Sequence, residues 1–134
     1  MPRELVYLDS SALVKLVLPE PQSEALLATL DSWPARVTSE IARVEVIRAA
    51  RRGSLDLEVE RRAEHVLAAL DLLGLDEAVI DRAARLEPRS LRALDALHLA
   101  SALSLGDDLG VMVVYDRVLG AAAVALGVEV MAPE

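Results

Sequence analysis

Two short apolar segments, one near each end of the chain, run directly into an aspartate. Residues 5–8 (Leu-Val-Tyr-Leu) precede Asp9, and residues 111–115 (Val-Met-Val-Val-Tyr) precede Asp116. Segments this short, without alternation of apolar and polar residues, are typical of strands buried on both faces of a parallel sheet that helices cover. Ligands of such sheets bind just beyond the carboxyl ends of the strands. The sequence therefore predicts an acidic site at that edge of a parallel sheet.

Helical patterns separate the predicted strands along the whole chain. Pro19 and Pro21 end the first helix, Gly53 ends a later one, and Asp56 and Asp76 stand where helix caps are expected. The alternation of strands and helices predicts an α/β fold with right-handed crossovers. We expect helices over about 10–18, 26–33, 39–52, 56–70, 76–88, 91–105 and 117–126, and strands over 5–8, 35–38, 111–115 and 128–131, with a possible further strand within 70–75.

Length and composition limit the classes of protein to consider. A chain of 134 residues with 54% hydrophobic residues fits one domain, residues 1–134, with a sizeable core. The absence of cysteine excludes disulfides, thiolate zinc sites and a cysteine nucleophile. No apolar leader precedes the first predicted strand, and no apolar segment approaches membrane-spanning length. We therefore expect a cytoplasmic protein with no membrane partner.

The charge balance disfavours broad adhesion to nucleic acid. The formal net charge is -8, so any contact with nucleic acid must be local. Lys15 is the only lysine, and arginine is the better residue for paired hydrogen bonds to phosphate or carboxylate. The arginines near Glu45 fit either a solvated helix face with intrahelical ion pairs or a phosphate-binding rim, and both interpretations stay open. These arginines are Arg43, Arg48, Arg51 and Arg52.

The two strand-end aspartates have an ordinary structural alternative. Asp9 and Asp116 each precede a predicted helix and could cap its free backbone amides. Ser10 or Ser11 could cap the first helix instead, and an acid at the end of a buried strand is a typical ligand position. Because the two aspartates form a pair at one sheet edge, we expect both to be functional.

Two further acids lie within predicted helices. Asp95 shares a helix face with apolar residues, where an unpaired charge is costly, so it needs a cation or a partner. Glu45 could form an ion pair with Arg48, and Glu40 is a rival acid better placed for the helix dipole. His98, one turn after Asp95, could ligate metal or orient that carboxylate, although a structural imidazole is the commoner role.

Four carboxylates that converge on one crevice would need metal ions. Ligands that offer only oxygen select a hard cation, so Mg²⁺ or Mn²⁺ is the expected cofactor. The sequence contains no Gly-rich phosphate loop, no histidine pair at zinc spacing and no Ser-His-Asp arrangement. The candidate catalytic and metal-binding residues are Asp9, Glu45, Asp95 and Asp116.

Four motifs, taken in order and at their spacing, carry a family resemblance that extends over nearly the whole chain. They are residues 7–13 (YLDSSAL), Ser39 followed by Glu45, residues 94–100 (LDALHLA), and residues 115–117 (YDR) leading to Leu126 and Gly127. Together they resemble the PIN-domain ribonucleases, and most of all the toxin half of a VapBC toxin–antitoxin pair.

The resemblance implies a fold, an activity and partners. The fold would be a three-layer sandwich, with a central parallel sheet of four to five strands flanked by helices and the first and fourth strands adjacent. The four acids would hold Mg²⁺ or Mn²⁺ and cleave single-stranded or looped RNA, with the Ser10 hydroxyl lining the site. Relatives usually form homodimers and are silenced by an antitoxin whose tail covers the acidic groove.

The chain departs from the family pattern in two ways. Tyr115 stands where many relatives have Thr or Ser, and no second acid follows Asp116 in the next three residues. The number of bound metal ions, one or two, therefore stays open. Apolar residues in the first two helices fit either core packing or contacts with a partner. These residues are Leu16, Leu26, Leu30 and Trp33.

We expect a Mg²⁺- or Mn²⁺-dependent endoribonuclease that is the toxin of a type II toxin–antitoxin pair. One alternative is a catalytically silent PIN-fold module that binds proteins. The other is a phosphoacceptor signalling domain, which predicts an adjacent acid pair after the first strand and a lysine after a late strand. Here Ser10 follows Asp9 and the only lysine is Lys15, so this second alternative fits poorly.

Overall fold

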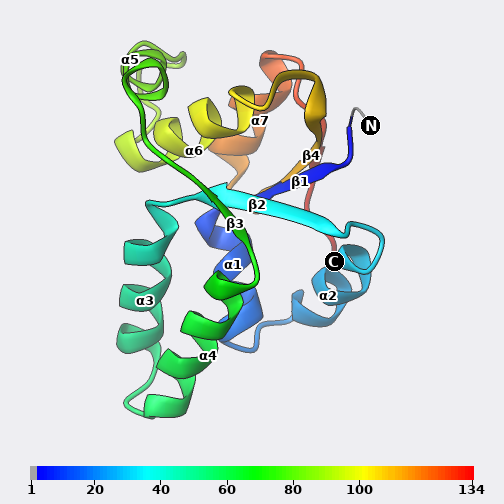
Figure 1. The fold of residues 1–134 in the computed structure, drawn as a ribbon, viewed down its shortest axis with the longest axis vertical. Helices are drawn as coiled ribbons and strands as arrows, with labels where there is room; N and C mark the ends of the chain where they lie inside the picture. Colours follow the sequence, from blue (N-terminus) through cyan, green and yellow to red (C-terminus); the bar gives the residue numbers. More distant parts are fainter. Residues whose placement is uncertain (1–2) are drawn as a thin grey trace.

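A parallel sheet of five strands lies at the centre of the computed structural model, which describes residues 3–134 (Figure 1). The strand order is β3-β2-β1-β4-β5, so the first and fourth strands are adjacent in the middle of the sheet. The predicted parallel sheet of four to five strands is therefore confirmed. The strands are β1 (Leu5–Leu8), β2 (Ala35–Ser39), β3 (Asp71–Leu73), β4 (Leu109–Val113) and β5 (Val130–Met131).

Helices cover both faces of the sheet and complete a three-layer sandwich (Figure 1). One face packs against α1 (Ser10–Val17), α2 (Ser23–Leu30), α3 (Ala42–Gly53) and α4 (Leu57–Ala68). The other packs against α6 (Ala93–Leu103) and α7 (Arg117–Ala125), and α5 (Glu77–Ala84) packs on α6. None of the helices between residues 3 and 134 combines the length and the apolar character that crossing a membrane requires.

Both central strands are buried on both faces, as their unbroken apolar sequences predict. Val6 and Leu8 of β1 contact the layer of α1–α4, whereas Tyr7 between them contacts the layer of α6 and α7. Val113 and Met112 of β4 divide between the two faces in the same way. Complete burial of one such aliphatic side chain contributes roughly 1.5–3 kcal/mol to folding. The strands that end near the two aspartates are thus the most firmly held part of the sheet.

Aspartates begin four of the helices. The predicted helix starts at Asp56 and Asp76 are confirmed, since each carboxylate accepts a hydrogen bond from a backbone amide of the first turn. Asp9 caps α1 through the Ala12 N–H, and Asp116 caps α7 in the same manner. The capping role foreseen as an alternative for the two strand-end acids is therefore real.

The end of β4 differs from the prediction. The strand ends at Val113, although the apolar sequence continues to Tyr115. The Tyr115 N–H donates to the Ser11 hydroxyl (3.1 Å), so it bonds to α1 and not to a neighbouring strand. Asp116 is therefore separated from β4 by a short extended turn, whereas Asp9 follows β1 directly.

Helix boundaries differ from the prediction by three residues or more in three helices. α2 covers Ser23–Leu30 and not 26–33. α3 begins at Ala42 without a side-chain cap, because Ser39 is still the last residue of β2 and its hydroxyl accepts from the Ile41 N–H in the preceding turn. The expected start of this helix at residue 39 is therefore wrong. α5 ends at Ala84, well before Pro88, so the proline is not what ends it.

The four apolar residues for which core packing and partner contacts were both considered belong to the core. Leu26 and Leu30 are buried, and Leu16 and Trp33 pack partly buried against the same cluster. Gly110 leaves room for the indole, since a Cβ there would lie 2.5 Å from the Trp33 ring. These side chains fill the core and leave little surface for a partner.

Candidate active site

A groove of about 730 Å³ lies beyond the carboxyl ends of β1 and β4, and we call it the acidic groove. All four predicted acids line it, and they come from different elements of the chain. Ser10, at the start of α1, also lines this groove. The acids are Asp9 after β1, Glu45 in α3, Asp95 in α6 and Asp116 before α7.

Asp9 is the most buried of these acids, with 2% of its surface exposed. Its Oδ1 accepts from the Ala12 N–H (3.0 Å) and from the Ser11 hydroxyl (2.6 Å), which itself accepts from the Tyr115 N–H. Burial raises the pKa of Asp9 from 3.8 to about 6, and the negative charge of Asp95 adds to the rise. Within residues 3–134, Oδ2 accepts no hydrogen bond, so capping uses only one of the two oxygens.

Asp95 and Asp116 are more open to solvent. Asp116 is exposed and uses Oδ1 to accept from the Leu119 N–H (2.9 Å). Asp95 is half-buried in the first turn of α6, and in the described part of the chain its carboxylate has neither a hydrogen bond nor an ion pair. Burial raises the pKa of Asp95, and repulsion from Asp116 and Glu45 raises it further. The groove acids therefore act on one another electrostatically.

Glu45 is held by a buried histidine. His98 Nε2 lies 2.6 Å from Glu45 Oε1, and His98 Nδ1 lies 2.7 Å from the Tyr7 hydroxyl. Burial raises the pKa of the Tyr7 hydroxyl well above its usual range, so it keeps its proton. The sequence left the role of His98 open between a metal ligand, a partner of Asp95 and a structural imidazole. In the structure it is fully buried and orients Glu45, not Asp95.

Arginines form a rim around the acidic groove. Arg48 and Arg52 of α3 and Arg92 at the start of α6 line it, and within residues 3–134 none of them forms an ion pair. The alternative pairing of Glu45 with Arg48 is absent, because His98 takes its place. Arg51 does form an ion pair, but with Glu60 of α4 (2.6 Å), so this pair joins two helices and is not intrahelical. The rim interpretation suits Arg48 and Arg52.

The donor set of the acidic groove fits a hard divalent cation. It offers carboxylate oxygens from four residues, and two of these residues, Asp9 and Asp116, keep one oxygen outside their capping bonds. Across residues 3–134, no three acidic or histidine side chains lie close enough to form a ready-made ligand set. Mg²⁺ keeps several waters and uses one or two carboxylates together with substrate phosphates. The arrangement therefore fits such an ion better than a metal that requires a closed protein cage.

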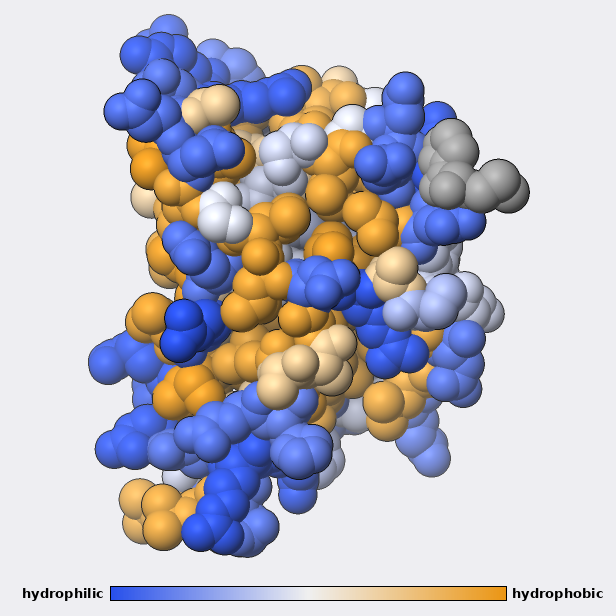
Figure 2. Space-filling model, viewed as in Figure 1, coloured by the Kyte–Doolittle hydropathy of each residue, from blue (hydrophilic) through white to orange (hydrophobic). Residues whose placement is uncertain are grey.

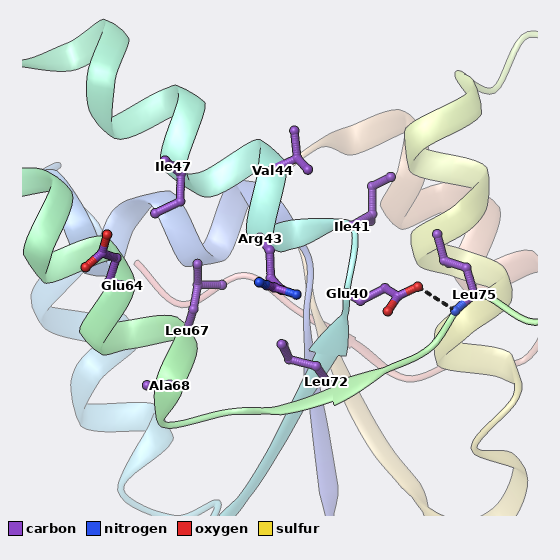
Figure 3. Close-up of a pocket in the computed structure, with 10 residues that line it drawn as sticks. All are labelled: Glu40, Ile41, Arg43, Val44, Ile47, Glu64, Leu67, Ala68, Leu72 and Leu75. Atoms are coloured by element: carbon purple, nitrogen blue, oxygen red, sulfur yellow. Dashed lines mark hydrogen bonds between the residues drawn. The ribbon is translucent and has the colours of Figure 1, made fainter.

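A second groove, of about 790 Å³, lies on the other side of α3 between α4 and β3, and we call it the apolar groove (Figure 3). Figure 2 shows apolar side chains gathered on this face of the molecule. Glu40 lines this groove and accepts from the Leu75 N–H (3.2 Å), so the rival acid lies outside the acidic groove. Val44, 59% exposed, lines both grooves. Apolar residues of the groove include Ile41, Val44, Ile47, Leu67 and Leu72.

Two residues of the site were missed in the sequence. Ser11 was considered only as a helix cap. Its hydroxyl in fact donates to Asp9 and accepts from the backbone N–H in the turn before Asp116. Tyr7 was assigned only to a buried strand. A signal for Tyr7 was available, because a buried tyrosine needs a partner for its hydroxyl and this chain has only two tyrosines and no phenylalanine.

Comparison with known proteins gives consistent similarities. The family model described as PIN domain matches residues 6–129. The chain is 49% identical to Ribonuclease VapC46 of Mycobacterium tuberculosis, over 96% of this chain and 97% of that protein. The similarity therefore extends over nearly the full length of both proteins and is not confined to the motifs.

Solved structures share the fold. VapBC2 from Rickettsia felis, bound to a DNA fragment from its promoter, gives a TM-score of 0.77 at 10% identity, covering 97% of this chain and 99% of that one. Mycobacterium tuberculosis VapC20, described as a sarcin-ricin loop cleaving toxin, gives a TM-score of 0.70 at 17% identity, covering 87% of this chain and 94% of that one. Both sandwiches match the arrangement of strands and helices seen here.

Proposed function

This chain belongs to the PIN-domain family, in the group of the VapC ribonucleases, and we propose that it is the ribonuclease toxin of a type II toxin–antitoxin pair. We further propose that it is one PIN domain over residues 1–134 and cleaves RNA with Mg²⁺ or Mn²⁺. The observation that carries the proposal is the acidic groove, which four carboxylates from separate elements line together with arginines that form no ion pair within residues 3–134.

The proposed ligands of the cation are Asp9, Glu45, Asp95 and Asp116. A bound Mg²⁺ or Mn²⁺ would neutralise the scissile phosphate, orient a water for attack on phosphorus and stabilise the leaving oxygen. Asp9 and Asp116 would each use one oxygen to hold a helix start and the other to bind the cation. The negative charge of the carboxylates would repel the phosphates of RNA until a bound cation reverses the sign of the local electrostatic potential.

The arginine rim would hold the phosphates on either side of the cleaved bond. Arg48, Arg52 and Arg92 line the acidic groove from two helices, and guanidinium groups bind phosphate through paired hydrogen bonds. RNA outside A-form helices exposes its bases and is easier to accommodate in such a groove. We therefore propose single-stranded or looped RNA as the substrate, and we propose that cleavage takes place in the cytoplasm.

Incubation of the purified, antitoxin-free protein with mixed cellular RNA tests this proposal. We expect cleavage at discrete positions with millimolar Mg²⁺ or Mn²⁺, because the cation is needed to offset the carboxylates. EDTA should abolish cleavage, and mapping of the cut ends should identify the target. Undiminished cleavage in EDTA would overturn the metal mechanism. Absence of cleavage with either cation would favour the catalytically silent binding module.

The phosphoacceptor alternative loses its support. Lys15, the only lysine, lies on α1 and forms an ion pair with Glu20 (2.6 Å) instead of following a late strand. The chain also belongs to the PIN-domain family over residues 6–129.

We propose that the antitoxin covers both grooves. The acidic and apolar grooves meet at Val44, so one segment lying across α3 could reach both. Its apolar side chains would fill the apolar groove, and its basic side chains would meet the carboxylates and block the cation. The apolar contacts expected of an antitoxin would then come from α3, α4 and β3, since Leu26 and Leu30 are buried in the core. The predicted homodimer stays a prediction.

Leu72→Lys should weaken inhibition by the cognate antitoxin. Leu72 is 39% exposed in the apolar groove, and a lysine there removes an apolar anchor. Loss of one such anchor costs about 1.4 kcal/mol or more, so we expect the antitoxin Kd to rise about tenfold or more. Leu126→Lys is the matched control, because Leu126 is 44% exposed and lines neither groove. Equal effects of both substitutions in a binding titration would contradict this assignment.

A further inference from the structure

A buried series of hydrogen bonds links three elements that surround the acidic groove. Tyr7 of β1 bonds to His98 of α6, and His98 bonds to Glu45 of α3, at 2.7 and 2.6 Å. The partners are 91 and 53 positions apart in sequence. Tyr7 and His98 are completely buried, and only Glu45 reaches the groove. Only the tertiary fold brings these three side chains together.

An ionised carboxylate and a neutral imidazole together define one arrangement of the hydrogen atoms in this series. An ionised Glu45 only accepts, so Nε2 of His98 must carry a hydrogen. In the neutral ring Nδ1 is then an acceptor, and the Tyr7 hydroxyl donates to it. Every donor points toward Glu45, and consecutive bonds of this kind strengthen one another.

Core packing alone does not explain a tyrosine and a histidine at these positions. The Tyr7–His98 pair lies among aliphatic core residues, and Thr38 and Ser101, both buried, are polar neighbours of the Tyr7 hydroxyl. A buried donor or acceptor that lacks its partner destabilises the folded state. Tyr7 and His98 therefore satisfy each other's buried polar groups, and the series of hydrogen bonds ends at the carboxylate of Glu45.

Glu45 needs such a unit more than the other groove acids do. Asp9 and Asp116 are fixed by the helix starts that they cap. Glu45 has a longer side chain, and in the described part of the chain its carboxylate has no hydrogen-bond partner except His98. Fixing a glutamate side chain in one conformation costs rotamer entropy. Because the hydrogen bond to His98 forms during folding, the Glu45 side chain is already ordered before any ligand binds.

We propose that His98, held in place by Tyr7, is a positioning residue that fixes Oε1 of Glu45 and so presents Oε2 to the divalent cation of the acidic groove. This role rests on the proposed function, since it assumes a cation in the groove. Loss of a partner behind a metal ligand typically lowers metal affinity or activity by roughly 10- to 100-fold.

A double-mutant cycle tests the role, with Mn²⁺ affinity measured by calorimetry in the absence of RNA. Tyr7→Phe and His98→Leu should each raise the Mn²⁺ Kd by roughly 10- to 100-fold when Glu45 is present. In the Glu45→Gln background the same substitutions should have almost no further effect, because the carboxylate that they position is gone. His98→Gln keeps an N–H donor and should recover part of the affinity. The kcat for RNA cleavage should follow the same pattern.

Leu99→Val is the matched control, because Leu99 is equally buried in α6 and is an apolar core residue that takes no part in the hydrogen-bonded series. It should lower the Tm and leave the Mn²⁺ Kd unchanged. Should His98→Leu fail to fold, Tyr7→Phe, which removes a single oxygen, carries the cycle. Equal losses with and without the Glu45 carboxylate would overturn the positioning role. If wild type neither binds Mn²⁺ nor cleaves RNA, the proposed function fails too; if it does both while the losses are additive, only the positioning role fails.

Discussion

Asp9→Asn and Asp95→Asn should each reduce RNA cleavage by on the order of 10³-fold at saturating Mg²⁺, because several kcal/mol of transition-state stabilisation depend on the cation that these charges hold. Asparagine keeps the size of the side chain and one oxygen. In Asp9→Asn that oxygen can still accept from the Ala12 N–H, so the start of α1 is preserved. Initial rates on a short single-stranded RNA, with and without EDTA, measure the effect.

Glu40→Gln is the control for this loss. Glu40 lies just before α3 but lines the apolar groove, where it accepts from the Leu75 N–H. The Glu40→Gln substitution should therefore leave kcat/KM within about twofold of wild type. If the Asp9 and Asp95 variants cleave as fast as the Glu40 variant, the four carboxylates have no part in the reaction.

Local sequence was sufficient to find the edge where the acids gather. A short apolar sequence followed by an aspartate predicts both a buried strand and the end at which that strand stops. This pattern located Asp9 and Asp116. Asp95 could be found because a charge stands among apolar residues at helical spacing. The capping role of Asp9 and its proposed site role could not be separated in this way, because the proposed role would use the carboxylate oxygen that the capping bond leaves free.

Local sequence was insufficient wherever the partner lies far along the chain. The pairing of Glu45 with Arg48 that was considered as an alternative follows helical spacing, yet His98 from another helix takes that place. The shortened β4 has the same origin, since the Tyr115 N–H finds the Ser11 hydroxyl from α1. In both cases a tertiary contact replaces the local interaction that spacing suggests, and only the fold supplies it.

Asp9→Asn should also stabilise the metal-free protein, with a rise of several degrees in Tm at about pH 7. Burial raises the pKa of Asp9 from 3.8 to about 6, so its ionised form costs the folded state on the order of 3 kcal/mol, which asparagine avoids. The folded state binds this proton more tightly than the unfolded chain does. The penalty is therefore full above about pH 6 and fades as the pH falls toward about 4.

Thermal melts of wild type and Asp9→Asn in EDTA, at several pH values, test this prediction. The difference between the two proteins should be largest near neutral pH and should vanish in acid, because wild type then carries the proton as well. Asp95→Asn should act in the same direction but less strongly, since Asp95 is only half-buried. Millimolar Mg²⁺ should reverse the order, because a cation that binds only the folded state stabilises wild type more than either variant. A helix cap without a site function predicts the opposite: Asp9→Asn would be neutral or destabilising at every pH, and Mg²⁺ would not change the difference.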